Sequence, residues 1–215
     1  MGNIAGSFQK ARLETFTGQS ATHDPQEIIT SLSESEKYHA SSVSDPATQQ
    51  RAMQNSWFFS ALVEITSEAA STPLRIVEQA RINDKPIDVD NHPFEEIFKS
   101  PNPHMDGNFL MRYTTTWSKL DGNAYWFLAP DDNGNLSEIW PLPSDAVTPI
   151  PGDNTTGNYL DYYEYRANGK LFQIDPYYIA HFQNIPNPWN LFDGLSELFA
   201  GALPIDSDTA MLRWQ

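Results

Sequence analysis

At 215 residues, with 40% hydrophobic and 13% aromatic residues, the chain is long and apolar enough to bury the core of one large domain. Its formal net charge is −15, from 28 acidic residues against 13 Lys and Arg, which argues against a protein that wraps nucleic acid or docks on an anionic membrane. The lack of cysteine excludes disulfides, thiolate nucleophiles and cysteine-based zinc sites.

The first 50 residues are rich in Ser, Thr, Gln, Glu and Ala and show no sustained hydrophobic period. Such a segment buries too little apolar surface to offset its loss of conformational entropy. We therefore expect residues 1–50 to form an arm that is flexible alone or ordered by a partner, with weak helical character only at Gln26–Leu32. The apolar stretch Trp57–Ile65 is too short to span a membrane, and we predict no membrane contact.

Three helices are predicted after the arm. Apolar residues at helical spacing over residues 52–70 indicate an amphipathic helix, with a buried stripe formed by Trp57, Ala61, Leu62, Ile65 and Ala69. A second, short helix begins at His92-Pro93 and ends before the prolines of residues 100–103. Asp106 is the predicted N-cap of a third helix, with a buried stripe formed by Phe109, Leu110, Tyr113 and Trp117.

The chain then turns to β-structure, so the expected class is α+β, with helices packed on antiparallel hairpins. One hairpin is predicted from residues 124–129 and 136–141, joined through 131–134. A second is predicted from residues 159–166 and 170–174, joined by Asn168-Gly169, a strong turn signal. Further expected segments are a strand at 74–78, a loop at 149–157, a strand at 178–182, and a final helix capped by Ser196 and kinked by Pro204.

A series of short motifs runs along this folded part in a set order. They are His92-Pro93-Phe94, Ser100-Pro101-Asn102-Pro103, Leu120-Asp121-Gly122-Asn123-Ala124-Tyr125, Trp140-Pro141-Leu142-Pro143, Asp175-Pro176-Tyr177-Tyr178-Ile179-Ala180-His181-Phe182 and Asp193-Gly194-Leu195-Ser196. In order and spacing they resemble the HK97-type family of tailed-phage portal proteins. Glu197 departs from the family pattern, which has a proline after the serine.

The resemblance implies a wing-like portal domain at residues 51–195 and the start of a stem-leading helix at residues 196–215. It implies a structural, non-enzymatic subunit without a cofactor or bound metal, located at one vertex of the virion and assembled in the host cytoplasm. The implied partners are copies of the same chain in a ring, a dodecamer at full length, and the terminase large subunit, the major capsid protein or scaffold, a head-tail adaptor, and DNA passing non-specifically. The acidity fits a channel whose wall must not hold phosphates.

Individual residues also allow chemical interpretations. His92 and Glu95 could begin a metal site, but no third ligand is near in sequence, and a His before Pro commonly caps a helix. His181 could be a general base, although we interpret it as a buried or interface histidine. Ser196 lacks the second glycine of a nucleophile elbow and is read as an N-cap. The carboxylate pairs Asp131-Asp132 and Asp206/Asp208 suggest a hydrolase only weakly.

Aromatic density supports a rival function, an acidic carbohydrate-binding module of a phage tail or a secreted enzyme. The residues that could form its stacking platform are Trp126, Trp140, Tyr162, Tyr163 and Tyr165. Strand aromatics more often form cores, so we expect these rings to pack inside the domain. Trp189 lies in a predicted loop, and we expect it to anchor a contact between subunits.

Overall fold

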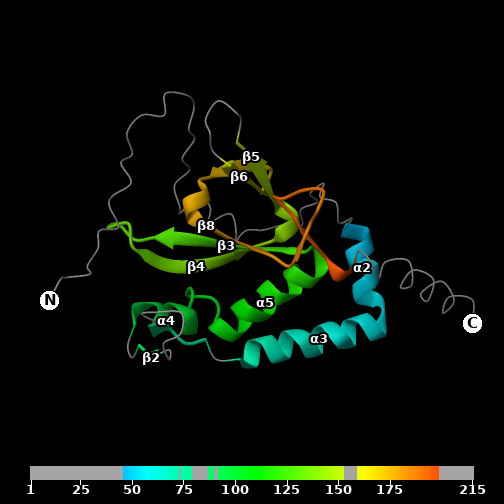
Figure 1. Cartoon of the computed structure of the whole chain (residues 1–215), viewed down its shortest axis with the longest axis horizontal. Coiled ribbons are helices and arrows are strands. Elements are labelled where there is room, and N and C mark those ends of the chain that lie inside the picture. Colours follow the sequence, from blue (N-terminus) through cyan, green and yellow to red (C-terminus); the bar gives the residue numbers. More distant parts are fainter. Residues whose placement is uncertain (1–45, 73, 79–86, 90–91, 153–158, 199–215) are drawn as a thin grey trace, which may run out of the picture.

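The computed structural model describes residues 46–72, 74–78, 87–89, 92–152 and 159–198, and it confirms the α+β class (Figure 1). The helices are α2 (Pro46–Gln54), α3 (Ser56–Ser71), α4 (Pro93–Lys99) and α5 (Gly107–Leu120), with 3-10 turns η1 (Ser144–Ala146) and η2 (Pro176–Tyr178). The longer strands are β3 (Asn123–Pro130), β4 (Leu136–Leu142), β5 (Val147–Pro151), β6 (Leu160–Ala167), β7 (Lys170–Ile174) and β8 (Ile179–Gln183). The two-residue strands are β1 (Val77–Glu78), β2 (Ile87–Asp88), β9 (Ile185–Pro186) and β10 (Gly194–Leu195).

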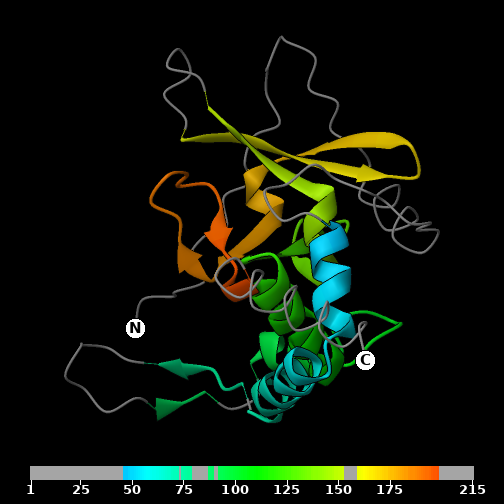
Figure 2. The same cartoon turned by 90° about the vertical axis from the view of Figure 1, so that its right-hand side faces the viewer.

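Two three-stranded antiparallel sheets and two long helices form successive layers (Figures 1 and 2). One sheet has the order β5-β6-β7, the other has the order β4-β3-β8, and α5 and α3 follow on its far side. Each of the two sheets has only three strands, and each has one face in the main aromatic core. Burial between layers, and not strand pairing alone, therefore stabilises the fold.

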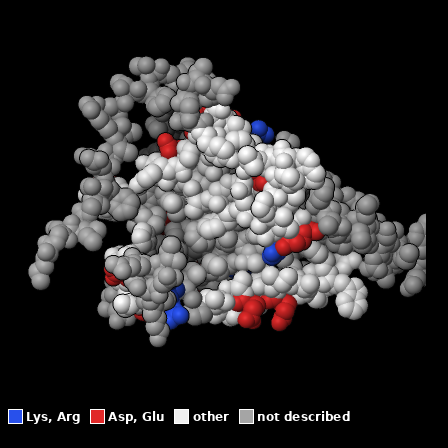
Figure 3. Space-filling model, viewed as in Figure 1, with Lys and Arg blue, Asp and Glu red and all other residues white. Residues whose placement is uncertain are grey.

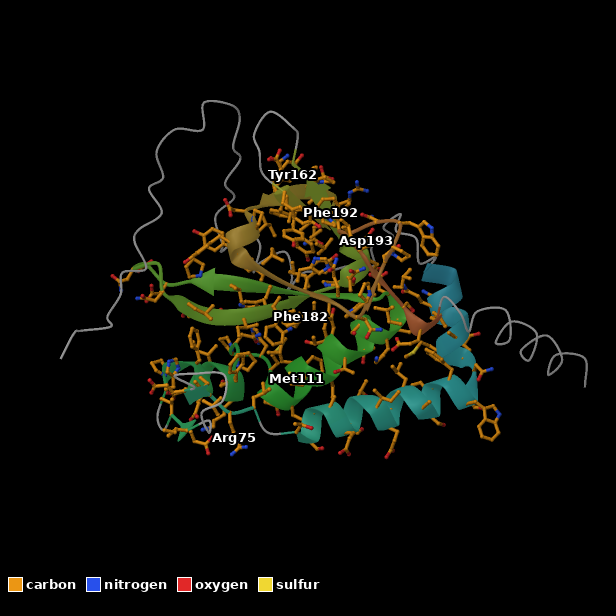
Figure 4. All side chains as sticks on the ribbon, in the orientation of Figure 1. Arg75, Met111, Tyr162, Phe182, Phe192 and Asp193 are labelled. Carbon is orange, nitrogen blue, oxygen red and sulfur yellow. The ribbon has the colours of Figure 1, made fainter. Side chains whose placement is uncertain are left out.

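The central strand β3 contributes to two cores because its side chains alternate between the faces of the sheet. Tyr125 and Phe127 point into the core between the two sheets, which also contains Tyr165 and Phe172. Trp126, the residue between them, lies in a second core on the helix side of the sheet. This second core holds Leu110, Ile139 and several half-buried side chains, among them Met111 (Figure 4).

The predicted helix at residues 52–70 is in fact two helices separated at Asn55. Asn55 has an extended backbone, and its side-chain oxygen accepts hydrogen bonds of 3.1 Å from the backbone N–H groups of Trp57 and Phe58. It therefore caps α3 and separates it from α2. The predicted buried stripe is also partly wrong, since Trp57 is 82% exposed and Ile65 is 46% exposed.

Helix α5 begins as predicted, with Asp106 accepting a 2.7 Å hydrogen bond from the N–H of Phe109. Its buried residues include Leu110 and Thr114, and the Thr114 hydroxyl accepts a 2.7 Å bond from the Trp126 indole. The expected burial of Phe109 is wrong, since its side chain is about half exposed. The ring stacks on Tyr113 of the next turn instead.

Both predicted hairpins are present, as β3–β4 and β6–β7. At the second turn Asn168 and Gly169 both have positive φ, 52° and 70°, as a tight hairpin requires. The predicted loop at residues 149–157 is partly wrong, because Val147–Pro151 forms β5 and pairs with β6. Prolines 149 and 151 are tolerated there because β5 is an edge strand, where one side of the backbone has no strand partner.

The remaining predictions have mixed outcomes. The strand expected at residues 74–78 is reduced to β1, which pairs with β2, and the strand expected at 178–182 is β8, which pairs with β3. None of the helices in the described ranges is long and apolar enough to cross a membrane. Of the predicted arm at residues 1–50, residues 46–50 belong to α2 instead, and the part up to residue 45 lies outside the described residues. The kink at Pro204 and the pair Asp206/Asp208 also lie outside them.

Candidate functional site

Several of the motif residues meet at one place, where the end of α5, the starts of β3 and β10, and strand β8 come together. We call this place the motif junction. Its members from the sequence motifs are Gly122, Asn123, Tyr125, His181, Gly194 and Ser196. Segments separated by about 70 residues in the chain are thus joined by the residues that the motifs identified.

Asn123 is the centre of the junction and is 5% exposed. Its side-chain oxygen accepts hydrogen bonds from the N–H of Gly194, at 2.7 Å, and from Nε2 of His181, at 3.0 Å. Its amide nitrogen donates to Asp121 at 3.2 Å. Because the oxygen already accepts from a backbone N–H, the proton of a neutral His181 must lie on Nε2. Nδ1 then accepts from the Tyr163 hydroxyl at 3.3 Å.

His181 is an uncharged structural histidine. Burial lowers its pKa from 6.5 to about 4, against the opposing effect of the nearby Asp121 carboxylate. The ring stacks on Tyr125 with a centroid distance of 4.3 Å, and burial raises the pKa of that tyrosine well above its ordinary value. Since both ring nitrogens have partners within the domain, the arrangement positions chain segments and leaves no nitrogen directed at a substrate.

Two glycines allow the backbones at the junction to touch. Gly122 has a φ of +88°, and a Cβ added there would lie 2.5 Å from the carbonyl carbon of Leu195. A Cβ at Gly194 would overlap the carbonyl oxygen of Gly122. That oxygen accepts a 2.9 Å hydrogen bond from the N–H of Asn184. Any side chain at either position therefore forces the two segments apart.

Ser196 acts as the predicted N-cap. Its hydroxyl accepts a 2.8 Å hydrogen bond from the N–H of Leu198 and donates a 2.9 Å bond to the carbonyl of Lys119. Glu197, which replaces the family proline, pairs with the Lys119 ammonium at 2.6 Å and accepts from Asn184 at 2.8 Å. Partial burial raises the pKa of Glu197, but the bonds from Lys119 and Asn184 outweigh this effect, so the pKa is lowered overall. The residue that departs from the family pattern therefore forms contacts of its own.

The earlier motifs form local structural contacts away from the junction. The Asn102 amide donates to the carbonyl of Ile139 at 2.9 Å, and the N–H of Ile139 donates to Pro101 at 2.7 Å, so the turn that ends at Pro103 covers the free edge of β4. Ala124 is buried in β3.

Two further motif residues cap helical turns. His92, followed by Pro93, accepts a 3.2 Å hydrogen bond at Nδ1 from the N–H of Phe94 and so caps α4. Asp175 caps η2 by accepting a 2.8 Å bond from the N–H of Tyr177. His92 and Asp175 thus each satisfy a backbone N–H group at the start of a helical turn.

The chemical alternatives receive little support from this geometry. Within the described residues no group of three or more His, Cys, Asp or Glu side chains could hold a metal ion. Asp131 lies at a hairpin tip and accepts hydrogen bonds from the N–H groups of Asn133 and Asn135. These bonds, chiefly the one from Asn135, lower the pKa of Asp131. The alternative of an exposed stacking platform is contradicted, and the expectation that these rings pack inside the domain is confirmed for four of the five, each at most 8% exposed, namely Trp126, Trp140, Tyr163 and Tyr165.

Sequence reasoning missed several members of the junction, including Lys119, Asp121, Tyr163 and Asn184. Asp121 receives hydrogen bonds from Asn123 and from the Ser144 hydroxyl. Asp121 belongs to the motif Leu120-Asp121-Gly122-Asn123, but no local pattern links it to Ser144. Likewise, no local pattern links the strand aromatic Tyr163 to His181.

Comparisons with known proteins agree with this structure. A family model described as phage portal protein matches residues 56–215. A chain in the neck of an empty gene transfer agent particle, computed with C6 symmetry, superposes with a TM-score of 0.69 and 20% identity over 87% of this chain and 49% of its own length. A chain in the neck of a native particle, computed with C12 symmetry, has a TM-score of 0.63 and 20% identity over 86% of this chain and 48% of its own length.

A curated relative is an uncharacterized protein of Rickettsia bellii (strain RML369-C). It is 31% identical over 128 residues, which are 58% of this chain and 32% of the relative. The chain therefore spans about half the length of the structural relatives and about a third of this one. The family match confirms the portal resemblance that the motifs indicated.

Proposed function

Because the chain belongs to the phage portal protein family, we propose that it is the wing-like part of a portal subunit of the HK97 type, a structural component of a ring through which DNA passes. The family match over residues 56–215 is the observation that carries this proposal. The similarity of fold to a chain in a gene transfer agent neck supports it. The motif junction supports it as well, because its residues hold segments together.

We propose that copies of the chain assemble into a closed ring, a dodecamer at full length. A structural relative comes from a neck computed with C12 symmetry, which supports a cyclic arrangement of this size. Such a ring uses two different surfaces of each subunit, since each copy contacts one neighbour on either side. Trp189, which is 79% exposed on the loop between β9 and β10, is a proposed anchor of a subunit contact.

The acidic composition of the chain supports a role in a channel that DNA crosses without binding tightly to the wall. With a net charge of −15, the chain offers few cations to release counterions from a duplex. The proposed partners are the terminase large subunit during packaging, the major capsid protein or scaffold, and a head-tail adaptor afterwards. The proposed location is the portal vertex of the virion, with assembly in the host cytoplasm, and no reaction is assigned to the chain.

Light scattering after size exclusion, followed by negative-stain microscopy, tests the proposal. Closed rings are the expected result, and their diameter should not change when an oligosaccharide is added. Monomers that are stabilised against heat by an oligosaccharide would instead favour the carbohydrate-binding alternative. Monomers that respond to no sugar, at every concentration and ionic strength, would contradict both functions.

A further inference from the structure

The chain leaves the described part of the domain through a helical turn that begins after Ser196. Glu197 and Leu198 are helical, and Leu198 is 4% exposed, so this turn starts inside the packed domain. Residues 199–215 follow it. The contacts that hold the turn therefore set the direction in which the rest of the chain leaves the domain.

Three polar side chains from separate segments meet at the start of this turn. The Lys119 ammonium, near the end of α5, lies 2.6 Å from Oε1 of Glu197 and donates to Oδ1 of Asn184 at 3.3 Å. The Asn184 amide, between β8 and β9, donates to Oε2 of Glu197 at 2.8 Å. Each of the three side chains thus contacts the other two, and we call Lys119, Asn184 and Glu197 the exit clamp.

The domain side of the exit clamp is fixed by the motif junction. The N–H of Asn184 donates to the carbonyl of Gly122 at 2.9 Å, and the carbonyl of Lys119 accepts a 2.9 Å bond from the Ser196 hydroxyl. Lys119 and Asn184 are therefore held in place by backbone contacts, and only Glu197 belongs to the departing turn. Its carboxylate links that turn to two segments of the domain at once.

The exit clamp depends on charge and is partly open to solvent. The Lys119 side chain is 25% exposed and the Glu197 side chain is 45% exposed. Dissolved salt weakens such pairs, because the Debye length falls from about 10 Å at about 0.1 M to about 3 Å at about 1 M. Most of the face in Figure 3 carries no charge, and a basic side chain there lies directly against an acidic one. Few other charges on this face are therefore placed to substitute for either partner.

We propose that the exit clamp is a salt-sensitive joint that fixes the direction in which the chain leaves the domain. With the pair intact, the departing turn is held against the end of α5 and the segment between β8 and β9. When the pair is screened or removed, Ser196 still caps the turn, but the carboxylate of Glu197 no longer restrains it, so the departing chain samples a wider range of directions. This inference goes beyond the proposed function, since it concerns a single copy of the chain whether or not rings form.

A proline at position 197 would restrain the turn in a different way. Position 197 is the first helical residue, where the fixed φ of proline suits the helix and its missing N–H costs no hydrogen bond. Such a restraint does not depend on charge. Because the family pattern has a proline at this place, the exit clamp substitutes an ion pair for a stiff backbone.

Double electron–electron resonance between two spin labels measures the range of exit directions. The full chain has no cysteine, so labels attach only at Arg112→Cys, on the exposed side of α5, and at Asp208→Cys, in the departing segment. Labelled chain is diluted with an excess of unlabelled chain, so that only distances within one copy are measured. Glu197→Gln and Lys119→Met should each broaden the distance distribution by at least about half. The double variant should be no broader than either single variant, because each change breaks the same pair.

Amide hydrogen exchange at Leu198 gives an independent measurement, because its N–H donates to the Ser196 hydroxyl at 2.8 Å. Relative to the buried N–H of Gly194, exchange at Leu198 should be about threefold faster in each single variant. The wild type should approach the same rate as the salt concentration rises from about 0.1 M to about 1 M.

Two control variants show whether salt acts through the exit clamp. Glu197→Pro should keep a narrow distance distribution at both salt concentrations, because its restraint carries no charge. Asp88→Asn, which breaks an exposed ion pair with Arg75 elsewhere in the domain, is the matched control and should keep the salt dependence of the wild type. Circular dichroism and thermal unfolding establish that each variant is folded before it is compared.

Several results would overturn the inference. Unchanged distributions and exchange rates in both single variants would show that the pair restrains nothing. Loosening by Glu197→Gln but not by Lys119→Met would show that Glu197 acts only on the start of the helix. Effects that add in the double variant would show that the two residues act separately, and a Glu197→Pro variant as salt-sensitive as the wild type would show that salt acts elsewhere.

The test also separates the exit clamp from the proposed function. Because every distance is measured within one copy, a chain that never forms rings would contradict the proposed ring and leave the exit clamp standing. Rings whose subunits show the same distribution in the wild type and in both single variants would overturn the exit clamp and leave the ring intact.

Discussion

Acidification below about pH 6.5 should destabilise the domain through His181. Burial lowers the pKa of this residue from 6.5 to about 4, so the unfolded chain takes up a proton at a pH where the folded chain does not. The stability due to the neutral ring is complete above pH 6.5 and is lost as the pH falls toward 4. At about 1.4 kcal/mol per pKa unit, the loss is about 2 kcal/mol at pH 5 and about 3 kcal/mol at pH 4.

Urea unfolding of the full chain at pH 8 and pH 5, followed by tryptophan fluorescence, measures this loss. Many carboxylates also titrate, so the useful quantity is the difference between the wild type and His181→Gln, which cannot titrate at this position. The variant should be less stable at pH 8, because it loses the stacking on Tyr125, but its stability should fall by about 2 kcal/mol less between the two pH values.

His104→Gln, at an exposed histidine, is the matched control and should keep the pH dependence of the wild type. Equal pH dependence in the wild type and in His181→Gln would refute the reasoning. It would mean that His181 is not held neutral by the contacts described above, and that the junction is more open to water than the structure shows.

Three further substitutions test other parts of the fold by urea unfolding. Gly122→Ala should cost at least about 3 kcal/mol, because it combines a strained φ with overlap of the Leu195 backbone, whereas Gly134→Ala, at a similar φ but with open space around it, should cost only about 1 kcal/mol. Equal costs at the two glycines would contradict the close approach of backbones. Asn102→Ala should cost about 1–3 kcal/mol, because it leaves the Ile139 carbonyl without its buried donor, and a change below 0.5 kcal/mol would argue against this role. Asp106→Ala should cost about 1 kcal/mol by removing the N-cap of α5, and no loss of helix stability would count against that cap.

The features that the sequence predicted well depend only on residues close together in the sequence. The hairpin at Asn168-Gly169 follows from the low cost of positive φ at these two residues, and the cap at Asp106 follows from the unpaired N–H groups at a helix start. The motifs likewise contained Asn123, His181, Gly194 and Ser196, although only the structure shows that these residues meet. None of these inferences needed knowledge of distant contacts.

The sequence by itself therefore determined the α+β class, the two hairpins and the cap that starts α5. Only the tertiary structure decided that Trp57 and Ile65 stay exposed, because helical periodicity locates an apolar stripe but not which part of it a neighbouring helix covers. The same holds for the pairing of β8 with β3 and for the contact between His181 and Tyr163. Such contacts depend on how the layers stack. Surfaces that are distant in the sequence are buried against each other, and hydrophobic periodicity within one segment does not identify its partner.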